Sequence, residues 1–466
     1  CGFLYKSQPF LDHSNPDLSA TALYEIPYLD GVFCGKQVTD VHPNLSRGTV
    51  SGTTSFQIEN MTGTAQEVAF AINPGYEINS VQANGQSVPF EIDDYQESNM
   101  ALLNITIPDL ESIDLCFDYQ GFPQDWNLME TMQGKPEISS KYLCLENQTL
   151  APMIMNVGTA DGMFSSITDI TLPDTMTVIP FGIAEAKKEI EHDNGTITWR
   201  IEDTGTGGIL YAGDYVRQDI NAAGTSIQFY YGRKHHPIMK EANAVEAIQT
   251  VMEYCSSHYG IPSFSSLDSL KLIQGRVAGG GYAVSGASLV DEQDFTTQNL
   301  HNSEKGGIPG EVMIHEMVHQ WWGLGTMFDV SQPDSAWSAE GLTVYTTYRI
   351  IKELYGEAYA KEHYIDQWQT AVDDYYNNFY IRNPQYLEAL PEEKRLDISN
   401  QLSNMRYYNE MPLKILKAEE LLGGEEPMDL ILYQLFNRDV DPMYPYLTEQ
   451  EFLDACKLTE EDLNLD

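Results

Sequence analysis

Two histidines and a glutamate with the spacing of a metal site lie in the segment GIPGEVMIHEMVHQWWG. His315 and His319 are four residues apart, so on a helix both imidazoles lie on one face and can reach one metal ion. Glu316 is rotated by about 100° from the first histidine, close enough to act as a base on a metal-bound water without being a ligand. The spacing therefore predicts two zinc ligands and a general base.

A catalytic zinc site also needs a third protein ligand and an open fourth position. Glu340, in DSAWSAEGLTVYTTYRIIKELYG, is the candidate, because Ser335 or Ser338 could cap a helix whose first turns carry its carboxylate. Neither feature decides alone, since 10 histidines in 466 residues can give the first spacing by chance and acidic residues are common near helix starts. Their combination favours a catalytic zinc site.

The amino-terminal half is expected to form a β domain. Short apolar stretches alternate with turn signals from about Val50 to Tyr231, a pattern typical of antiparallel strands. Asn84-Gly85 lies between two strand-like runs and is the strongest short-range hairpin signal. We therefore expect an antiparallel β-sandwich-like domain over residues 1–233.

The carboxy-terminal half is expected to be mainly helical. In KEANAVEAIQTVMEYCSSHYG apolar residues recur at helical spacing and Gly260 supplies a helix stop. LDSLKLIQGRV has the pattern of a strand, and long amphipathic helices are expected from Pro309 onward. The chain is thus expected to be a multidomain α+β protein whose second domain covers residues 234–466.

The composition excludes several classes of partner. Sixty-nine acidic and 26 basic residues give a formal net charge of -43, which repels nucleic acid and anionic lipid. No run approaches the roughly 18 apolar residues that insertion into a membrane needs. Cys1-Gly2 resembles the start of a bacterial lipoprotein, so an extracellular or cell-surface location, with a membrane tether outside this segment, is expected while a cytoplasmic one stays open. The six scattered cysteines form no Cys-x-x-Cys pair, and their disulfide pairing stays open.

HEMVHQWWG followed by WSAEGLTVY resembles the HExxHxWxG and WxxEGxAxY motifs of the gluzincin zinc aminopeptidases, the membrane alanyl aminopeptidase family. The resemblance extends over roughly residues 50–420. It implies a thermolysin-like catalytic domain in the second half of the chain. It also implies Zn²⁺ as cofactor, with His315, His319 and Glu340 as ligands, and Glu316 as the general base in the hydrolysis of a peptide substrate.

The chain departs from this family pattern in two places. The 20 residues between His319 and Glu340 exceed the usual number by two, an insertion that a loop accommodates at little entropic cost. Where the family carries Gly-x-Met-Glu-Asn, whose glutamate binds the free amino group of the substrate, residues 279–286 contain no acid. The substrate-binding residues expected on this basis are Gly280, Gly281, Tyr282 and Ala283, with Glu146 as a substitute acid.

Tyr408, in NMRYYNEMPLKIL, matches the tyrosine with which the family stabilises the oxyanion, although Tyr407 lies beside it and the register stays open. The leading expectation is an aminopeptidase-like zinc peptidase of unknown oligomeric state. Two alternatives stay open. One is a zinc hydrolase of a non-peptide bond, such as an epoxide. The other is a peptide-binding or sensing ectodomain of a membrane transporter system with little turnover.

Overall fold

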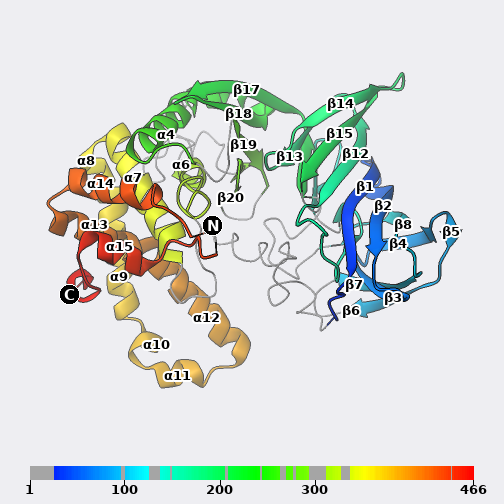
Figure 1. The fold of residues 1–466 in the computed structure, drawn as a ribbon. Helices are drawn as coiled ribbons and strands as arrows, with labels where there is room; N and C mark the ends of the chain where they lie inside the picture. The colour runs from blue at the N-terminus through cyan, green and yellow to red at the C-terminus, as the bar shows by residue number, and fades with distance from the viewer. Residues whose placement is uncertain are drawn as a thin grey trace. The chain divides into compact units, whose positions relative to one another are not determined.

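The computed structural model describes residues 26–95, 100–124, 137–146, 149–204, 208–241, 244–262, 269–276, 280–292, 311–326, 336–441 and 443–465. Two compact units make up the chain (Figure 1). The first comprises residues 1–217, 230–233 and 275–278, and the second comprises residues 218–229, 234–274 and 279–466.

The first unit consists of three β-sheets. In the largest, the strand order is β14 (Ala186–Glu191), β15 (Thr196–Thr204), β12 (Ser165–Pro173), β1 (Val32–Asn44), β2 (Thr49–Asn60), β8 (Ile113–Gly121), β4 (Tyr76–Ala83) and β5 (Gln86–Ser87). A second sheet has the order β13 (Thr177–Phe181), β16 (Ile209–Gly213), β10 (Tyr142–Glu146) and β9 (Glu137–Ile138). The third has the order β11 (Met153–Ile154), β3 (Gln66–Ile72), β7 (Met100–Ile107) and β6 (Phe90–Tyr95).

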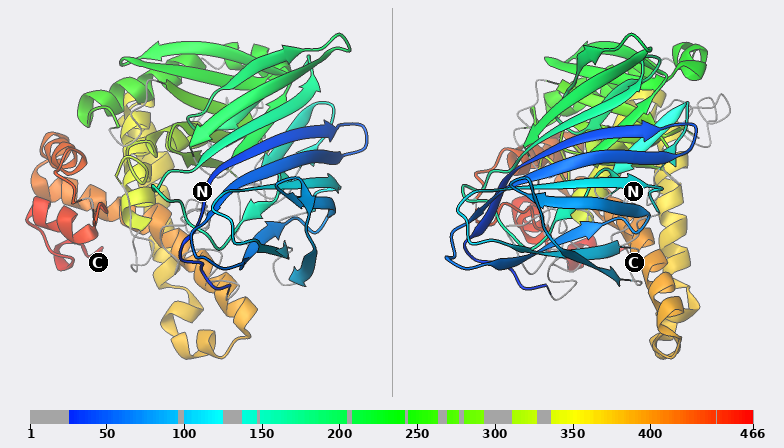
Figure 2. Two further views of the ribbon diagram at one scale, coloured as in Figure 1. Left: turned by 45° about the vertical axis from the view of Figure 1, so that its right-hand side comes forward. Right: turned by 90° about the vertical axis from the view of Figure 1, so that its right-hand side faces the viewer.

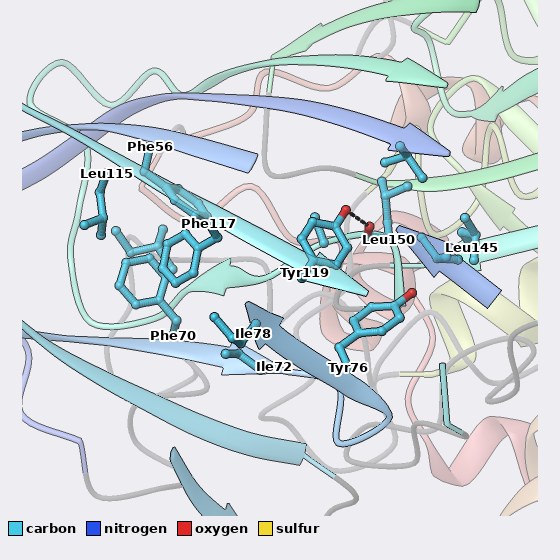
Figure 3. Packing of buried hydrophobic residues seen from close by; sticks show 14 of the residues in the cluster. Phe56, Phe70, Ile72, Tyr76, Ile78, Leu115, Phe117, Tyr119, Leu145 and Leu150 are labelled. Carbon is cyan, nitrogen blue, oxygen red and sulfur yellow. Dashed lines mark hydrogen bonds between the residues drawn. The ribbon is translucent and has the colours of Figure 1, made fainter. Parts of the chain in front are cut away.

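The hydrophobic core of this unit joins the large sheet to the other two (Figure 3). Every second residue of β8 is buried, as expected for a strand with one face on a core. Phe117 of β8 packs against Phe56 of β2 and Phe70 of β3, with ring centroids 5.7 and 4.8 Å away. Tyr119 of the same strand donates to Leu150 O at 2.6 Å, which satisfies its buried hydroxyl. The predicted β-sandwich-like domain is confirmed.

The sequence predicts one local feature of the first unit, a tight hairpin, and misses another, a parallel pair of strands. Asn84 and Gly85 have φ of 50° and 79° and join β4 to β5, so the predicted tight hairpin is confirmed. β1 and β12 instead pair in parallel, with Val38 opposite Ile167, in a domain expected to be antiparallel. A parallel pair needs a long connection, and the more than 100 residues between these two strands provide it.

The described residues of the second unit form a five-stranded sheet and a large set of helices. Its sheet has the order β17 (Tyr215–Ala222), β18 (Thr225–Gly232), β19 (Ser269–Gly275), β21 (Ala287–Asp291) and β20 (Gly281–Val284). Among the described strands β20 is the last in this order and so lies at the edge of the sheet. Two strands of the sheet thus precede residue 234 in the sequence.

The helices of the second unit confirm the mainly helical expectation. Before the candidate metal site lie η4 (Arg233–His235), α3 (His236–Glu241) and α4 (Ala244–His258). The site region contains α6 (Glu311–Val318), η8 (Trp337–Gly341) and α7 (Leu342–Tyr355). The rest are α8 (Glu357–Ala360), η9 (Lys361–Ile365), α9 (Asp366–Tyr376), α10 (Phe379–Arg382), α11 (Pro384–Glu388), α12 (Glu392–Met405), η10 (Arg406–Glu410), α13 (Met411–Leu422), α14 (Glu425–Phe436), α15 (Glu449–Cys456) and η11 (Glu461–Leu463).

The helices that follow the site region in sequence pack against one another. α9 and α12 pack side by side, and α10 and α11 join them at the tip of a hairpin (Figure 2). Gly260 follows α4 with a φ of 99°, which agrees with its predicted role as a helix stop. Pro309 lies outside the described residues. None of the helices in the described ranges is both long and apolar enough to cross a membrane.

The cysteines in the described part of the chain are free thiols. Four of them are buried and one is half-buried, and burial raises the pKa of the Cys34 thiol to about 12. Thiols of this kind are chemically inert packing groups. Cys1 lies outside the described residues. The free cysteines are Cys34, Cys116, Cys144, Cys255 and Cys456.

Replacing Phe117 by Ala is expected to lower the free energy of unfolding of the first unit by about 3–5 kcal/mol, because the truncation leaves a cavity between two other rings. The matched control is Phe122→Ala, since Phe122 is 58% exposed and its truncation should change stability by less than about 0.5 kcal/mol. Urea unfolding monitored by circular dichroism measures both. Equal midpoints for the two variants would contradict the assignment of Phe117 to the core.

Candidate metal centre

The two histidines of the sequence motif lie on one face of α6 and its continuation. His319 N donates to His315 O at 3.2 Å, so the helical hydrogen-bond pattern extends beyond Val318. Only 8% of His315 and 1% of His319 are exposed, and their Nε2 atoms are 3.1 Å apart. Their four-residue spacing thus brings both imidazoles to one point.

Glu340 brings a carboxylate to the same point. It lies on the π-helical turn η8, and its Oε2 is 3.1 Å from His315 Nε2 and 3.4 Å from His319 Nε2. Ligand atoms about 2.0–2.1 Å from a tetrahedral zinc ion lie about 3.3 Å from one another. The three atoms therefore form one face of a tetrahedron of the size that zinc requires, which leaves the fourth vertex for water or substrate.

The charges of this cluster also fit a cation. Among the described residues, Glu340 Oε1 is buried and has no hydrogen-bond partner, although a buried carboxylate normally needs one. Burial opposes its ionisation, yet His319 and His315 hold the pKa of Glu340 well below its usual value. Burial likewise lowers the pKa of His319, but Glu340 outweighs it and raises that pKa to about 9. A divalent cation would replace the imidazole proton and occupy the orphaned oxygen.

The backbone next to the motif orients His319. Its Nδ1 lies 3.0 Å from Trp322 O, and since a carbonyl only accepts, Nδ1 carries the proton. Thr343 Oγ1 lies 3.2 Å from the same nitrogen and donates to Trp322 O at 3.4 Å. Nε2 is therefore the nitrogen that faces Glu340 and His315, and it becomes free to bind a metal once a cation replaces its proton.

Glu316 is buried against the glycine-rich strand β20. Only 1% of it is exposed, and a Cβ added to Gly281 would lie 2.4 Å from Glu316 Cγ and 2.8 Å from its Oε1. Burial raises the pKa of the Glu316 carboxyl, an effect that His315 and His319 only partly oppose. Its backbone is fixed as well, because Ser288 Oγ donates to Glu316 O at 2.8 Å. A glycine at 281 thus makes room for the candidate base.

The glycines of the two sequence motifs also permit close approaches. A Cβ on Gly323 would lie 3.0 Å from Ala339 Cβ, next to the residue that supplies the third candidate ligand. A Cβ on Gly341 would lie 3.0 Å from Met411 Cβ, at the start of α13. Larger residues at either position would push η8 away from its neighbours.

Tyr408 lies on the π-helical turn η10, which packs against η8. Its half-buried ring is 6.3 Å from the His315 ring, centroid to centroid. The Tyr408 ring thus lies beside a candidate metal ligand, and its role as oxyanion donor stays a prediction.

The residues expected to bind substrate lie in two separate segments, one at β20 and one at the end of β10. Gly280 precedes β20, where Gly281, Tyr282 and Ala283 are buried. Gln320 ties this strand to the motif helix, since its side chain donates to Val284 O at 2.8 Å and accepts from Gly286 N at 3.1 Å. Glu146 ends β10 of the first unit, where Cys144 Sγ donates to its Oε1 at 3.8 Å. The substrate-binding roles of these residues stay predictions.

The structure excludes one of the two predicted helix caps before Glu340. Ser338 lies inside the π-helical turn and is fully buried, so it is not a helix cap. Ser335, the other candidate cap, lies outside the described residues. A π-helical turn inserts one residue into a helix and is common at functional sites, but it has no sequence signature comparable to a cap.

Several residues that support the site had not been predicted from the sequence. Gln320, Ser288 and Thr343 act through the hydrogen bonds described above. Two of them could have been suspected, because Gln320 follows the second histidine directly and Thr343 lies three residues after Glu340, one helical turn away. Ser288 carries no such signal, since its contact joins two distant segments.

Comparison with curated proteins finds relatives of the central part of the chain. The chain is 26% identical over 142 residues to leucine aminopeptidase 2 of Emericella nidulans, covering 30% of this chain and 22% of that protein. It is 30% identical over 115 residues to leukotriene A-4 hydrolase of Xenopus laevis, covering 25% of this chain and 18% of that protein. The chain thus spans about a fifth of the length of these relatives. No family model matches it.

Solved structures match almost the whole chain. A variant of an M1 zinc metallopeptidase from Deinococcus radiodurans superposes with a TM-score of 0.54 at 15% identity and covers 93% of both chains. This chain has the fold of the M1 zinc metallopeptidases. Leukotriene A4 hydrolase from Saccharomyces cerevisiae matches with a TM-score of 0.55 at 14% identity, covering 91% of this chain and 64% of that one. The predicted resemblance to gluzincin aminopeptidases is confirmed, and zinc is the metal named for the M1 neighbours.

Replacing Gly281 by Ala in this M1-type fold is expected to reduce hydrolysis of a peptide substrate about 10- to 100-fold, because the added methyl group displaces the Glu316 carboxyl by about 1 Å. Gly35→Ala is the matched control, since an added Cβ there meets nothing within 4 Å. Steady-state kinetics and zinc content measure the effect. Wild-type turnover in Gly281→Ala would contradict the contact, and a loss of zinc would show that the damage is not confined to Glu316.

Proposed function

We propose that this protein is a zinc peptidase, aminopeptidase-like in its reaction. The observation that carries the proposal is the triangle of His315 Nε2, His319 Nε2 and Glu340 Oε2, with sides of 3.1, 3.1 and 3.4 Å. Glu316 lies buried beside it, held between α6 and β20. Ligands for a catalytic zinc and a candidate base thus occur in one site of an M1-type fold.

The chemistry divides between the metal and the side chains. Zn²⁺ held by these residues would supply Lewis acidity and lower the pKa of a coordinated water to about 7. Glu316 would accept the proton of the attacking water and later give it to the leaving amine, a role that suits a carboxyl whose pKa is raised by burial. Tyr408 would donate a hydrogen bond to the oxyanion, beside His315.

An extended peptide is the substrate class that the site favours. β20 is an edge strand of its sheet, and an edge strand offers backbone groups to an added strand. Gln320 holds β20 at the motif helix, so a peptide paired with this strand would lie along the candidate metal centre. Relatives support this class: one is named a leucine aminopeptidase, and an M1 neighbour is described with a Tyr-Ser-Ala substrate.

Glu340→Ala is expected to lose the zinc ion that the wild type carries, one per chain, together with peptide hydrolysis, because two histidines alone do not complete a catalytic site. Glu316→Gln is the matched comparison: it should keep the zinc and lose at least about 100-fold in kcat, since it removes only the base. Metal content by mass spectrometry and hydrolysis of fluorogenic Ala and Leu substrates measure both. Wild-type protein without zinc would contradict the proposal.

N-acetylated forms of the same substrates test whether hydrolysis requires a free amino group, as it does in an aminopeptidase. Hydrolysis of only the free-amine substrates is expected if an acid elsewhere, such as Glu146, replaces the glutamate that the glycine-rich strand lacks. Hydrolysis of the blocked substrates would instead indicate an endopeptidase. Tight peptide binding without hydrolysis would favour the sensing ectodomain, and epoxide turnover alone would favour the non-peptide hydrolase. The extracellular or cell-surface location stays a prediction.

A further inference from the structure

The turn that carries Tyr408 is held by a buried carboxylate. Glu410 ends the π-helical turn η10 and is 3% exposed. Its Oε2 accepts from Arg406 Nε at 3.0 Å, and its Oε1 lies 3.3 Å from Lys414 Nζ. Tyr376 OH donates to Oε1 at 3.1 Å. One buried carboxylate thus binds two cations and a phenol.

These partners come from different helices. Tyr376 is the last residue of α9, Arg406 begins η10, and Lys414 lies on α13. α9, α12 and α13 all pack against η10. Glu410 therefore links η10 to α13, which follows it in sequence, and to α9.

The ionised form of Glu410 is favoured by its partners. Burial raises the pKa of this carboxyl, but Lys414 and Arg406 outweigh burial, and the pKa lies below its ordinary value. Loss of the charge would remove the counter-ion that Arg406 and Lys414 share. Charge-assisted hydrogen bonds of this kind are stronger than neutral ones.

Residue spacing places Glu410 opposite Tyr408. Two residues along a helical turn are roughly half a turn apart, so their side chains leave η10 on opposite sides. The Tyr408 ring lies beside His315, whereas Glu410 faces α9 through Tyr376. Holding Glu410 on one side therefore sets the rotation of the turn and the position of the phenol on the other.

We propose that Glu410 is a positioning residue: its ion pairs with Arg406 and Lys414 and its hydrogen bond from Tyr376 hold η10 so that Tyr408 reaches the oxyanion. The inference rests on the proposed function. It gives a role to the carboxylate that follows Tyr408 by two residues in the sequence Tyr408-Asn409-Glu410.

Glu410→Gln is the primary test, because it keeps the size of the side chain and removes its charge. It is expected to lower kcat about tenfold and to change KM by less than about twofold, since an oxyanion donor acts in the transition state. In a Tyr408→Phe background the same substitution should lower kcat by less than about twofold, because the group that it positions is gone. Additive losses would overturn the proposal.

Two further variants separate positioning from general loss of structure. Tyr376→Phe removes one neutral hydrogen bond to Glu410 at a half-exposed position and is expected to lower kcat by about two- to threefold with intact folding. Glu420→Gln, on the exposed face of α13, is the matched control and should leave kcat unchanged. Wild-type kcat in Glu410→Gln would overturn the proposal.

Hydrogen exchange of residues 405–411 gives a readout that does not depend on turnover. Glu410→Gln should exchange these amides about tenfold faster than the wild type, with zinc content unchanged. Unchanged exchange would overturn the positioning role. A wild-type protein that binds zinc but hydrolyses no peptide would overturn the proposed function instead. Faster exchange in Glu410→Gln would in that case still support the claim that Glu410 holds η10 in place.

Discussion

A glutamate carboxylate buried against two buried imidazoles is the interaction on which the second unit depends. Glu340 is 1% exposed, and an ionised carboxylate at such a position costs several kcal/mol unless cations and donors compensate it. His315 and His319 compensate one oxygen at 3.1 and 3.4 Å, and the second oxygen has no partner among the described residues. A divalent cation with a tetrahedral shell satisfies both demands at once. The position of α6 relative to η8 follows from this requirement.

Small residues and irregular helical turns make that arrangement possible. Gly323 and Gly341 let η8 approach the motif helix and α13, and Gly281 lets β20 approach Glu316. Glu340 and Tyr408 both lie on π-helical turns, which pack against each other. These irregular turns carry the third candidate ligand and the candidate oxyanion donor, and contacts of Glu410 with Tyr376 of α9 and Lys414 of α13 tie one of the turns to ordinary helices.

The sequence predicts features that depend on local periodicity or on a single backbone conformation. His315 and His319 meet because of helical spacing, and Asn84-Gly85 forms a hairpin because both residues accept a positive φ. Glu340 was a candidate third ligand from its position near a predicted helix start, and the motif resemblance strengthened that assignment, because 20 residues separate it from His319 and no local periodicity brings the two together. The π-helical turns, the parallel pairing of two strands and the contact of Gly281 with Glu316 arise from packing between distant segments. No local pattern encodes such contacts.

X-ray absorption at the zinc edge of the zinc-loaded protein tests the central claim most directly, because it reports the donor atoms themselves. We predict two imidazole nitrogens at about 2.0–2.1 Å and two oxygens, one from Glu340 and one from water, at about 2.0–2.2 Å, which makes four ligands in all. Glu340→Ala should lose the oxygen contribution of the carboxylate or the metal altogether. A sulfur shell at about 2.3 Å, or six oxygen ligands without imidazole, would contradict the assignment of His315, His319 and Glu340 as the metal site.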